Sequence, residues 1–147
     1  MASMTPLTLT FPARLNSLPQ LGEQLRRYLA PLSLPESWIF MLDLALCEAA
    51  TNIIRHGYEQ NLGKSYNVTF SIVENRSVIS LKDGGEPIPT ALLTAARSQP
   101  GDETAIEHLS ESGRGLRLIY DCVDDVDYRQ GDQENILTLI KRLPDKA

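Results

Sequence analysis

Residues 48–58 place an acid and an amide on an otherwise apolar helix and read Glu-Ala-Ala-Thr-Asn-Ile-Ile-Arg-His-Gly-Tyr. At about 100° per residue, Glu48 and Asn52 lie on the same side of that helix, one turn apart. Their side is away from a stripe of apolar residues spaced by three and four, which indicates packing on a core: Leu42, Leu46, Ala49 and Ile53. No other segment constrains the fold as strongly as this core helix with its polar strip.

The polar strip has two interpretations. A carboxylate beside apolar turns costs free energy unless it has a partner or a task. An amide oxygen next to a carboxylate suits Mg²⁺, which prefers oxygen ligands and keeps several waters. A solvated face of an amphipathic helix explains the same pattern, and this segment alone leaves both interpretations open.

Length and composition indicate one domain over residues 1–147, with 42% hydrophobic and 22% charged residues. The net charge of −5, without a cluster of basic residues, argues against direct nucleic-acid binding. We find no apolar run near 18 residues and no signal-peptide layout, so we expect a cytoplasmic protein without a membrane partner. Cys47 and Cys122 have apolar neighbours and are expected to be buried, reduced thiols.

Alternating apolar and polar residues predict a sheet, and Pro and Gly mark its breaks. Ser17 is the predicted N-cap of the first helix, and Gly57 the predicted end of the long one. We predict an α+β fold: a two-layer α/β sandwich with a mainly antiparallel mixed sheet and helices on one face. Strands are predicted at 7–11, 66–72, 78–83, 125–129 and 135–143, helices at 17–29, 36–58, 91–97 and 115–122, and a mobile loop over most of 84–112.

Asp83 ends the predicted strand 79–83 on the same face as Ile79 and Leu81. Because that face is expected to be the core face, the carboxylate should point inward, and the glycines at 84 and 85 allow close approach to the backbone. A buried acceptor at a strand end suits the exocyclic amine of a base such as adenine. An ordinary Asp-Gly-Gly turn is the alternative.

Gly113, Arg114 and Gly115 precede a predicted helix. Amide groups at a helix start, freed of side chains by glycine, bind phosphate well. A simple helix start is the alternative, because Gly-x-Gly is a weak signal and completes neither the Rossmann nor the Walker pattern. Taken in this order, however, the three signals supply metal, adenine and phosphate contacts.

With these residues the chain resembles the Bergerat ATP-binding fold of gyrase, histidine kinases and MutL. Within it, the chain is similar to the anti-sigma-factor serine/threonine kinases of bacterial partner-switching systems, over roughly residues 7–143. The family's sequence boxes correspond to Glu48, Asn52 and 56–58, then to Asp83, Gly85 and Pro87, and then to Gly113, Arg114, Gly115 and Leu116 with 118–126.

The resemblance implies a role for each of these residues. Asn52 would hold Mg²⁺, and Glu48 would be the general base. Asp83 would bind the adenine amine, and Gly85 would leave room for the ring. Residues 88–112 would be the ATP lid. Further nucleotide contacts are implied for Arg55, Pro87, Gly113, Arg114, Gly115 and Leu116.

The implied function is ATP- and Mg²⁺-dependent phosphorylation of a STAS-domain anti-anti-sigma factor, together with sequestration of a sigma factor or another effector. An alternative is an ATP-binding module that sequesters its partner without phosphoryl transfer. Glu111 favours it, because some relatives carry an arginine there, whereas Glu48 favours a kinase. A homodimer through residues 7–11 is a further expectation.

Overall fold

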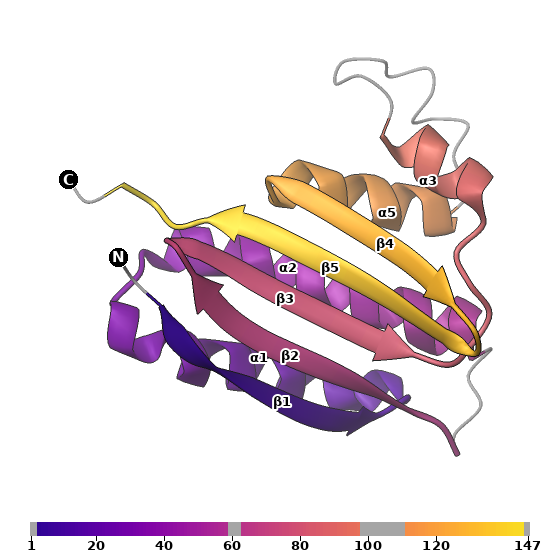
Figure 1. Cartoon of the computed structure of the whole chain (residues 1–147), viewed down its shortest axis with the longest axis horizontal. Coiled ribbons are helices and arrows are strands. Elements are labelled where there is room, and N and C mark those ends of the chain that lie inside the picture. Colours follow the sequence, from indigo (N-terminus) through magenta and orange to yellow (C-terminus); the bar gives the residue numbers. More distant parts are fainter. Residues whose placement is uncertain (1–2, 59–62, 98–110, 146–147) are drawn as a thin grey trace.

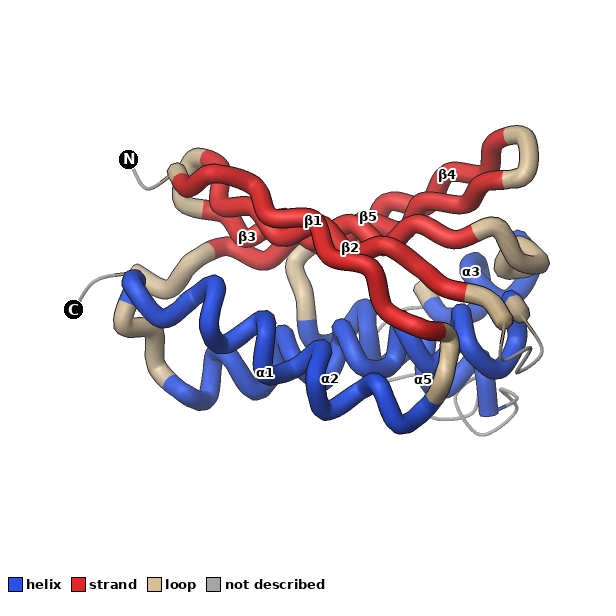
Figure 2. Tube along the Cα trace, turned by 90° about the horizontal axis from the view of Figure 1, so that it is seen from below, coloured by secondary structure: helices blue, strands red, loops and turns tan. Residues whose placement is uncertain are grey.

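The computed structural model describes residues 3–58, 63–97 and 111–145. A five-stranded sheet forms one layer, and the helices form a second layer on one of its faces (Figures 1 and 2). The predicted two-layer α+β architecture is confirmed. The spatial order is β1-β2-β3-β5-β4, with bounds Met4–Pro12 (β1), Ser65–Val73 (β2), Arg76–Asp83 (β3), Asp125–Gly131 (β4) and Glu134–Arg142 (β5).

The pairing of the strands is antiparallel throughout the described part of the chain. The prediction of a mixed sheet was therefore wrong in that detail. The β2–β3 hairpin pairs Val73 with Arg76, so its loop is the two residues Glu74 and Asn75, both with positive φ (51° and 64°). Such a two-residue turn twists with the strands it joins, and it fixes their register.

One face of the sheet is buried under the helices because β2, β3 and β5 alternate between buried and less buried residues. The central strands contribute Val68, Phe70, Ile79, Leu81 and Leu139 to the core. The helices are α1 (Leu18–Leu29), α2 (Glu36–Asn52), α3 (Thr90–Ala96) and α5 (Glu111–Cys122), with short turns η1 (Leu15–Ser17), η2 (Ala30–Leu32) and η3 (Ile53–Gly57).

Two details of the helices differ from expectation. Ser17 does not cap α1 with its side chain; its hydroxyl donates back to the carbonyls of Pro12 and Arg14, at 3.0 and 2.7 Å. The last turn of the long helix, Ile53–Gly57, is a π-helix, closed by the Tyr58 amide on the Ile53 carbonyl at 2.8 Å. Single π-turns inside helices are frequent at functional sites.

The helix Glu36–Gly57 is long and apolar enough to cross a membrane by length and composition, contrary to the expectation from sequence. Half of its most apolar window is buried in this fold, as in the core helix of a globular domain. Both cysteines are free; Cys122 is buried and Cys47 is partly buried. Burial raises the pKa of the Cys47 thiol to about 12, with a smaller contribution from Asp43.

Candidate nucleotide and phosphoacceptor site

Asp83 lies at the end of β3 with its carboxylate turned inward, as predicted, and is 9% exposed. The Gly85 amide donates to Oδ2 at 2.9 Å, and the Asn135 amide donates to the same oxygen at 3.4 Å. Burial raises the pKa of Asp83, and these two donors partly offset that rise. Because both hydrogen bonds from the described residues go to Oδ2, Oδ1 is left to accept a donor from a ligand.

Asn135, on β5, is a part of this site that the sequence did not reveal. It pairs with Asp83 across the β3–β5 ladder and is 3% exposed. Its amide also donates to the Gly85 carbonyl at 2.9 Å. The Asn135 side chain therefore holds both the Asp83 carboxylate and the turn at Gly85.

Gly85 packs directly on the backbone of Gly57. A Cβ at Gly85 would overlap the Gly57 carbonyl oxygen, which accepts a hydrogen bond from the Glu86 amide at 2.6 Å. A Cβ at Gly57 would in turn lie 3.3 Å from Asp83 Oδ2. The π-turn thus occupies the space beside Gly85. The expected role of Gly85 in leaving room for an adenine ring stays a prediction.

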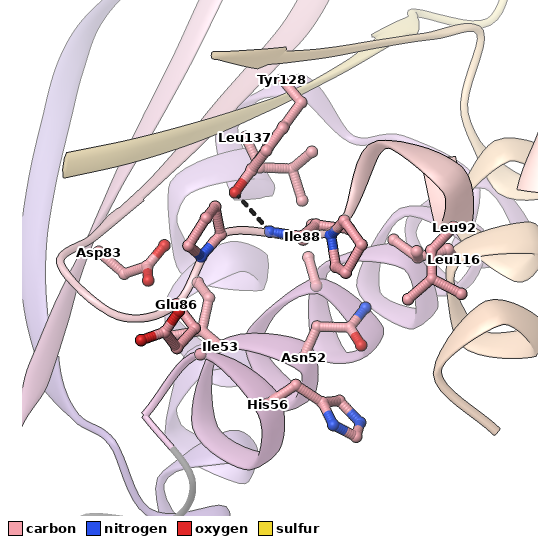
Figure 3. Close-up of a pocket in the computed structure, with 14 residues that line it drawn as sticks. Asn52, Ile53, His56, Asp83, Glu86, Ile88, Leu92, Leu116, Tyr128 and Leu137 are labelled. Carbon is pink, nitrogen blue, oxygen red and sulfur yellow. Dashed lines mark hydrogen bonds between the residues drawn. The ribbon is translucent and has the colours of Figure 1, made fainter. Parts of the chain in front are cut away.

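A cavity of about 320 Å³ opens between η3, the segment 86–89 and the helices α3 and α5. Figure 3 shows Asp83 at one end, Leu92 and Leu116 at the other, and Asn52 and His56 along the α2 side. The Tyr128 hydroxyl accepts a hydrogen bond from the Ile88 amide at 2.9 Å, which ties the segment to β4 (Figure 3). The remaining lining is mostly apolar: Ala49, Ile53, Gly57, Glu86, Pro87, Ile88, Pro89 and Leu137. Apolar walls with one convergent acceptor suit a flat heterocyclic ligand.

Asn52 is the last residue of α2, and its amide nitrogen is buried without a hydrogen-bond partner in the described structure. Buried amide atoms are normally paired, so this one needs a ligand or water. Since the nitrogen and oxygen of an amide exchange places on a half-turn, the position suits a phosphate oxygen or a cation.

The described residues contain no group of three or more His, Cys, Asp or Glu that would hold a metal alone. Mg²⁺ commonly takes one or two protein oxygens and completes its shell with waters and phosphate. Asn52 fits that kind of site.

A second hollow, of about 550 Å³, adjoins the cavity and shares Asn52 and His56 with it. It contains Glu48, one helical turn before Asn52, as the sequence predicted. Arg55, Arg114 and Gly115 also line it, together with Leu15, Leu18, Thr51 and Leu118. Apart from Gly85, the predicted site residues whose surroundings are described thus line one of the two hollows.

The glycine segment lies differently from the prediction. Helix α5 begins at Glu111 rather than near Gly115, so Gly113 falls in its first turn and Gly115 beyond it. Only the first amides of a helix lack an internal partner. Gly113 keeps an amide that can face phosphate, whereas the amides of Arg114 and Gly115 fall within the helix.

Part of the predicted lid has a structure: α3 forms where a helix was expected. Residues 98–110, including His108, lie outside the described residues, as does the side chain of Glu111. The expected mobility of the lid stays a prediction.

Comparison with known proteins identifies the family and the fold of this chain. A family model described as a histidine kinase-like ATPase domain matches residues 11–141. The chain is 29% identical over 96 residues to the serine-protein kinase RsbW of Bacillus mycoides (strain KBAB4). It is 30% identical over 96 residues to that of Bacillus cereus (strain AH820). Each match covers 65% of this chain and 59% of the relative, less than two thirds of its length.

Two solved structures share the fold. The RsbU and RsbW domains of Rv1364c from Mycobacterium tuberculosis align with a TM-score of 0.69 at 21% identity, covering 98% of this chain and 34% of that one. The SiaB-SiaC complex from Pseudomonas aeruginosa aligns with a TM-score of 0.61 at 18% identity, covering 91% of this chain and 88% of that one. The chain therefore belongs to the family of histidine kinase-like ATPase domains, and its resemblance to the serine-protein kinases of partner-switching systems is confirmed.

Proposed function

We propose that residues 1–147 form a single cytoplasmic domain that binds Mg²⁺-ATP and phosphorylates a serine or threonine of a partner protein. The observation that carries this proposal is the position of Glu48. Its carboxylate lines a hollow that joins the Asp83 cavity through Asn52 and His56. A base in a hollow that adjoins the nucleotide cavity suits proton removal from a second bound molecule during transfer.

In the proposed nucleotide complex, Asp83 accepts a hydrogen bond from the adenine amine, and the apolar walls around Leu116 and Leu137 cover the ring. The first-turn amide of Gly113 faces phosphate, with Arg55 and Arg114 at the second hollow. Asn52 supplies an oxygen ligand to Mg²⁺, which neutralises phosphate charge when it is bound.

Glu48 acts on the hydroxyl of the partner protein. A serine or threonine hydroxyl is a poor nucleophile near neutral pH, so a positioned carboxylate that accepts its proton accelerates attack on phosphorus. The hydroxyl oxygen forms the new bond to phosphorus, the bond to the leaving oxygen of ADP breaks, and the proton goes to Glu48. The rest of the acceleration comes from holding the two reactants in place.

For partners, we propose a STAS-domain anti-anti-sigma factor as the substrate and a sigma factor or similar effector as the protein held inactive. The support is the family relationship and the similarity to relatives that are serine-protein kinases. Homodimer formation through β1 also stays a proposal; β1 is an edge strand of the sheet.

The test is phosphoryl transfer from Mg²⁺-ATP to STAS-domain proteins from the same genome, detected as phosphoserine or phosphothreonine. Glu48→Gln should lower the rate by roughly 10²–10⁴-fold, the usual scale for a lost general base, with little change in ATP affinity. Glu23→Gln is the matched control, because Glu23 is an exposed glutamate on α1 paired with Arg27.

The outcomes separate the two functions considered. Undiminished transfer by Glu48→Gln would reject Glu48 as the base. Tight ATP binding without transfer by the wild-type protein would reject the kinase and favour a sequestering module that uses ATP as a structural ligand.

A further inference from the structure

We propose that Gly115 is a positioning residue for Glu48: the side chain that it lacks leaves the space in which the Glu48 carboxylate lies. This inference rests on the proposed role of Glu48 as general base. It concerns the contact between α5, which carries Gly115, and α2, which carries Glu48. The two helices lie side by side under the sheet in Figure 1.

The distance between the two residues is too short for any side chain at 115. A Cβ built on Gly115 would lie 2.7 Å from Glu48 Oε2 and 3.7 Å from Cδ. A Cβ atom essentially never approaches a nonbonded heavy atom closer than 3.0 Å. An alanine at 115 therefore forces the carboxylate to move.

Other reasons for a glycine at 115 do not apply. Its φ is not in the positive region that disfavours other residues, since it lies within the regular helix α5. Its amide falls beyond the first turn, so it does not serve as a free phosphate donor at the helix start. A glycine inside a helix is less favourable than alanine. The contact with Glu48 therefore explains why a glycine occupies position 115, although glycine is unfavourable inside a helix.

The Glu48 carboxylate packs against the backbone of α5 at Gly115. The absence of a side chain at position 115 therefore decides how closely Oε2 can approach that helix.

A second glycine contact on α2 provides an internal control. A Cβ at Gly22, on α1, would lie 3.0 Å from Oδ1 of Asp43, also on α2. Asp43 is paired with Arg26. Both glycines admit a carboxylate of α2 between packed helices, but only the Gly115 contact lies at the hollow that contains Glu48.

Gly115→Ala should act on the position of Glu48 rather than on folding, because the displaced group is the end of a flexible side chain. Misplacing a reacting group by about 1 Å costs on the order of 10²-fold in rate. We expect transfer by Gly115→Ala to fall by about 10–100-fold on this basis, with the KM for ATP unchanged.

The experiment compares the wild-type protein, Gly115→Ala, Gly22→Ala, Glu48→Gln and the double variant Gly115→Ala/Glu48→Gln. Transfer from Mg²⁺-ATP to the STAS-domain protein is measured together with ATP affinity by calorimetry and unfolding in urea. Carbon-13 NMR of side-chain carboxyl groups, with the Glu48 signal assigned by its loss in Glu48→Gln, gives a readout that does not need activity.

The following results are expected together. Gly115→Ala lowers kcat and moves the Glu48 carboxyl signal, while its ATP affinity equals that of the wild type. Gly22→Ala leaves kcat and that signal unchanged. Adding Gly115→Ala to Glu48→Gln causes no further loss, because the base that Gly115 positions is already absent.

Two results would overturn the inference. One is an unmoved Glu48 signal with wild-type transfer in Gly115→Ala. The other is an equal loss of ATP affinity and rate, which would assign Gly115 to the nucleotide. If the wild-type protein transfers no phosphate, the kinase proposal fails, and the Glu48 signal in Gly115→Ala alone decides whether the contact exists.

Discussion

Asn135 on β5 and Asp83 on β3 are paired across the two strands, and the Asn135 amide donates a hydrogen bond to the Asp83 carboxylate at 3.4 Å. The same amide donates to the Gly85 carbonyl at 2.9 Å. Asp83 is thereby held as a buried acceptor with one oxygen directed to the cavity, and the turn that carries it cannot shift independently.

The first prediction follows from this bridge. Asn135→Ala removes the hydrogen bonds from the Asn135 amide to the Gly85 carbonyl and to Asp83, which then keeps only the Gly85 amide as a donor among those described, so the free energy of unfolding should fall by about 1–3 kcal/mol. ATP affinity should fall as well, because Asp83 and the turn at Gly85 lose their common anchor. Urea unfolding and calorimetry measure the two effects.

Asn67→Ala is the control for that variant. The Asn67 side chain accepts a hydrogen bond from Thr10 at 2.7 Å on β2, is partly buried and does not line the cavity. A change within about 0.5 kcal/mol is expected there, as for ordinary surface substitutions. Equal losses in the two variants would contradict a special role for Asn135.

The second prediction concerns the pH dependence of stability. Burial raises the pKa of Asp83 above its ordinary value of 3.8, so the folded protein holds this proton to higher pH than the unfolded chain. The contribution of Asp83 to stability is therefore full below 3.8 and is lost as pH rises through the folded pKa. At neutral pH the ionised, buried carboxylate is destabilising relative to its neutral form.

Asp83→Asn should remove that dependence. As pH rises from acid to neutral, the free energy of unfolding of Asp83→Asn should increase relative to that of the wild type. Its ATP binding should weaken by about 1–3 kcal/mol. Asp127→Asn, at an exposed site paired with Arg129, should change neither. A difference between Asp83→Asn and the wild type that stays constant over the whole pH range would contradict the raised pKa.

Much of this architecture was predictable because its determinants are local. Alternation along 66–72 and 78–83 specifies two strands with one buried face, and the apolar stripe ending at Ile53 specifies the core helix. Glu48 and Asn52 were found for the same reason, since one helical turn joins them. Asp83 was found because strand alternation fixes which way it points.

The remainder depends on contacts between distant segments. Asn135 is 52 residues from Asp83 in sequence, and nothing around it signals the bridge. The start of α5 at Glu111 was missed because the glycines at 113 and 115 suggest a later start, whereas packing on α2 sustains the helix through them. Gly115 was assigned to phosphate for the same reason, since its neighbour Glu48 lies on another helix.

The third prediction concerns the wall of the cavity. The Tyr128 hydroxyl accepts from the Ile88 amide, so Tyr128→Phe leaves that amide without its partner, at a cost of about 1 kcal/mol. The segment 86–89 lines the cavity, and its loosening should weaken ATP binding and speed hydrogen exchange at Ile88.

Tyr28→Phe is the matched control for the loss of a hydroxyl. Tyr28 donates to the Thr5 carbonyl at 2.9 Å, between α1 and β1, and does not line the cavity. A similar loss of stability with unchanged ATP affinity is expected. ATP binding by Tyr128→Phe that matches the wild type would show that the 86–89 segment holds its place without this bond.

The last prediction concerns Asn52, whose buried amide nitrogen has no partner in the described structure. Asn52→Ala removes an unsatisfied polar group, so stability should stay the same or rise. The increase in ATP affinity that Mg²⁺ gives the wild type should disappear, as measured by calorimetry with and without the ion. A wild-type response to Mg²⁺ would place the ion on another residue.

Asn52→Asp then separates the two ways in which the amide can serve a nucleotide. If its oxygen binds Mg²⁺, a carboxylate keeps a hard oxygen ligand in nearly the same shape, and the Mg²⁺ response survives. If its nitrogen donates to phosphate, the carboxylate loses the donor and repels the phosphate, and binding falls with Mg²⁺ present as well as without it. We expect the first result, because Asn52 lies one turn from Glu48 at the junction of the two hollows, where the charge of the transferred phosphate has to be neutralised.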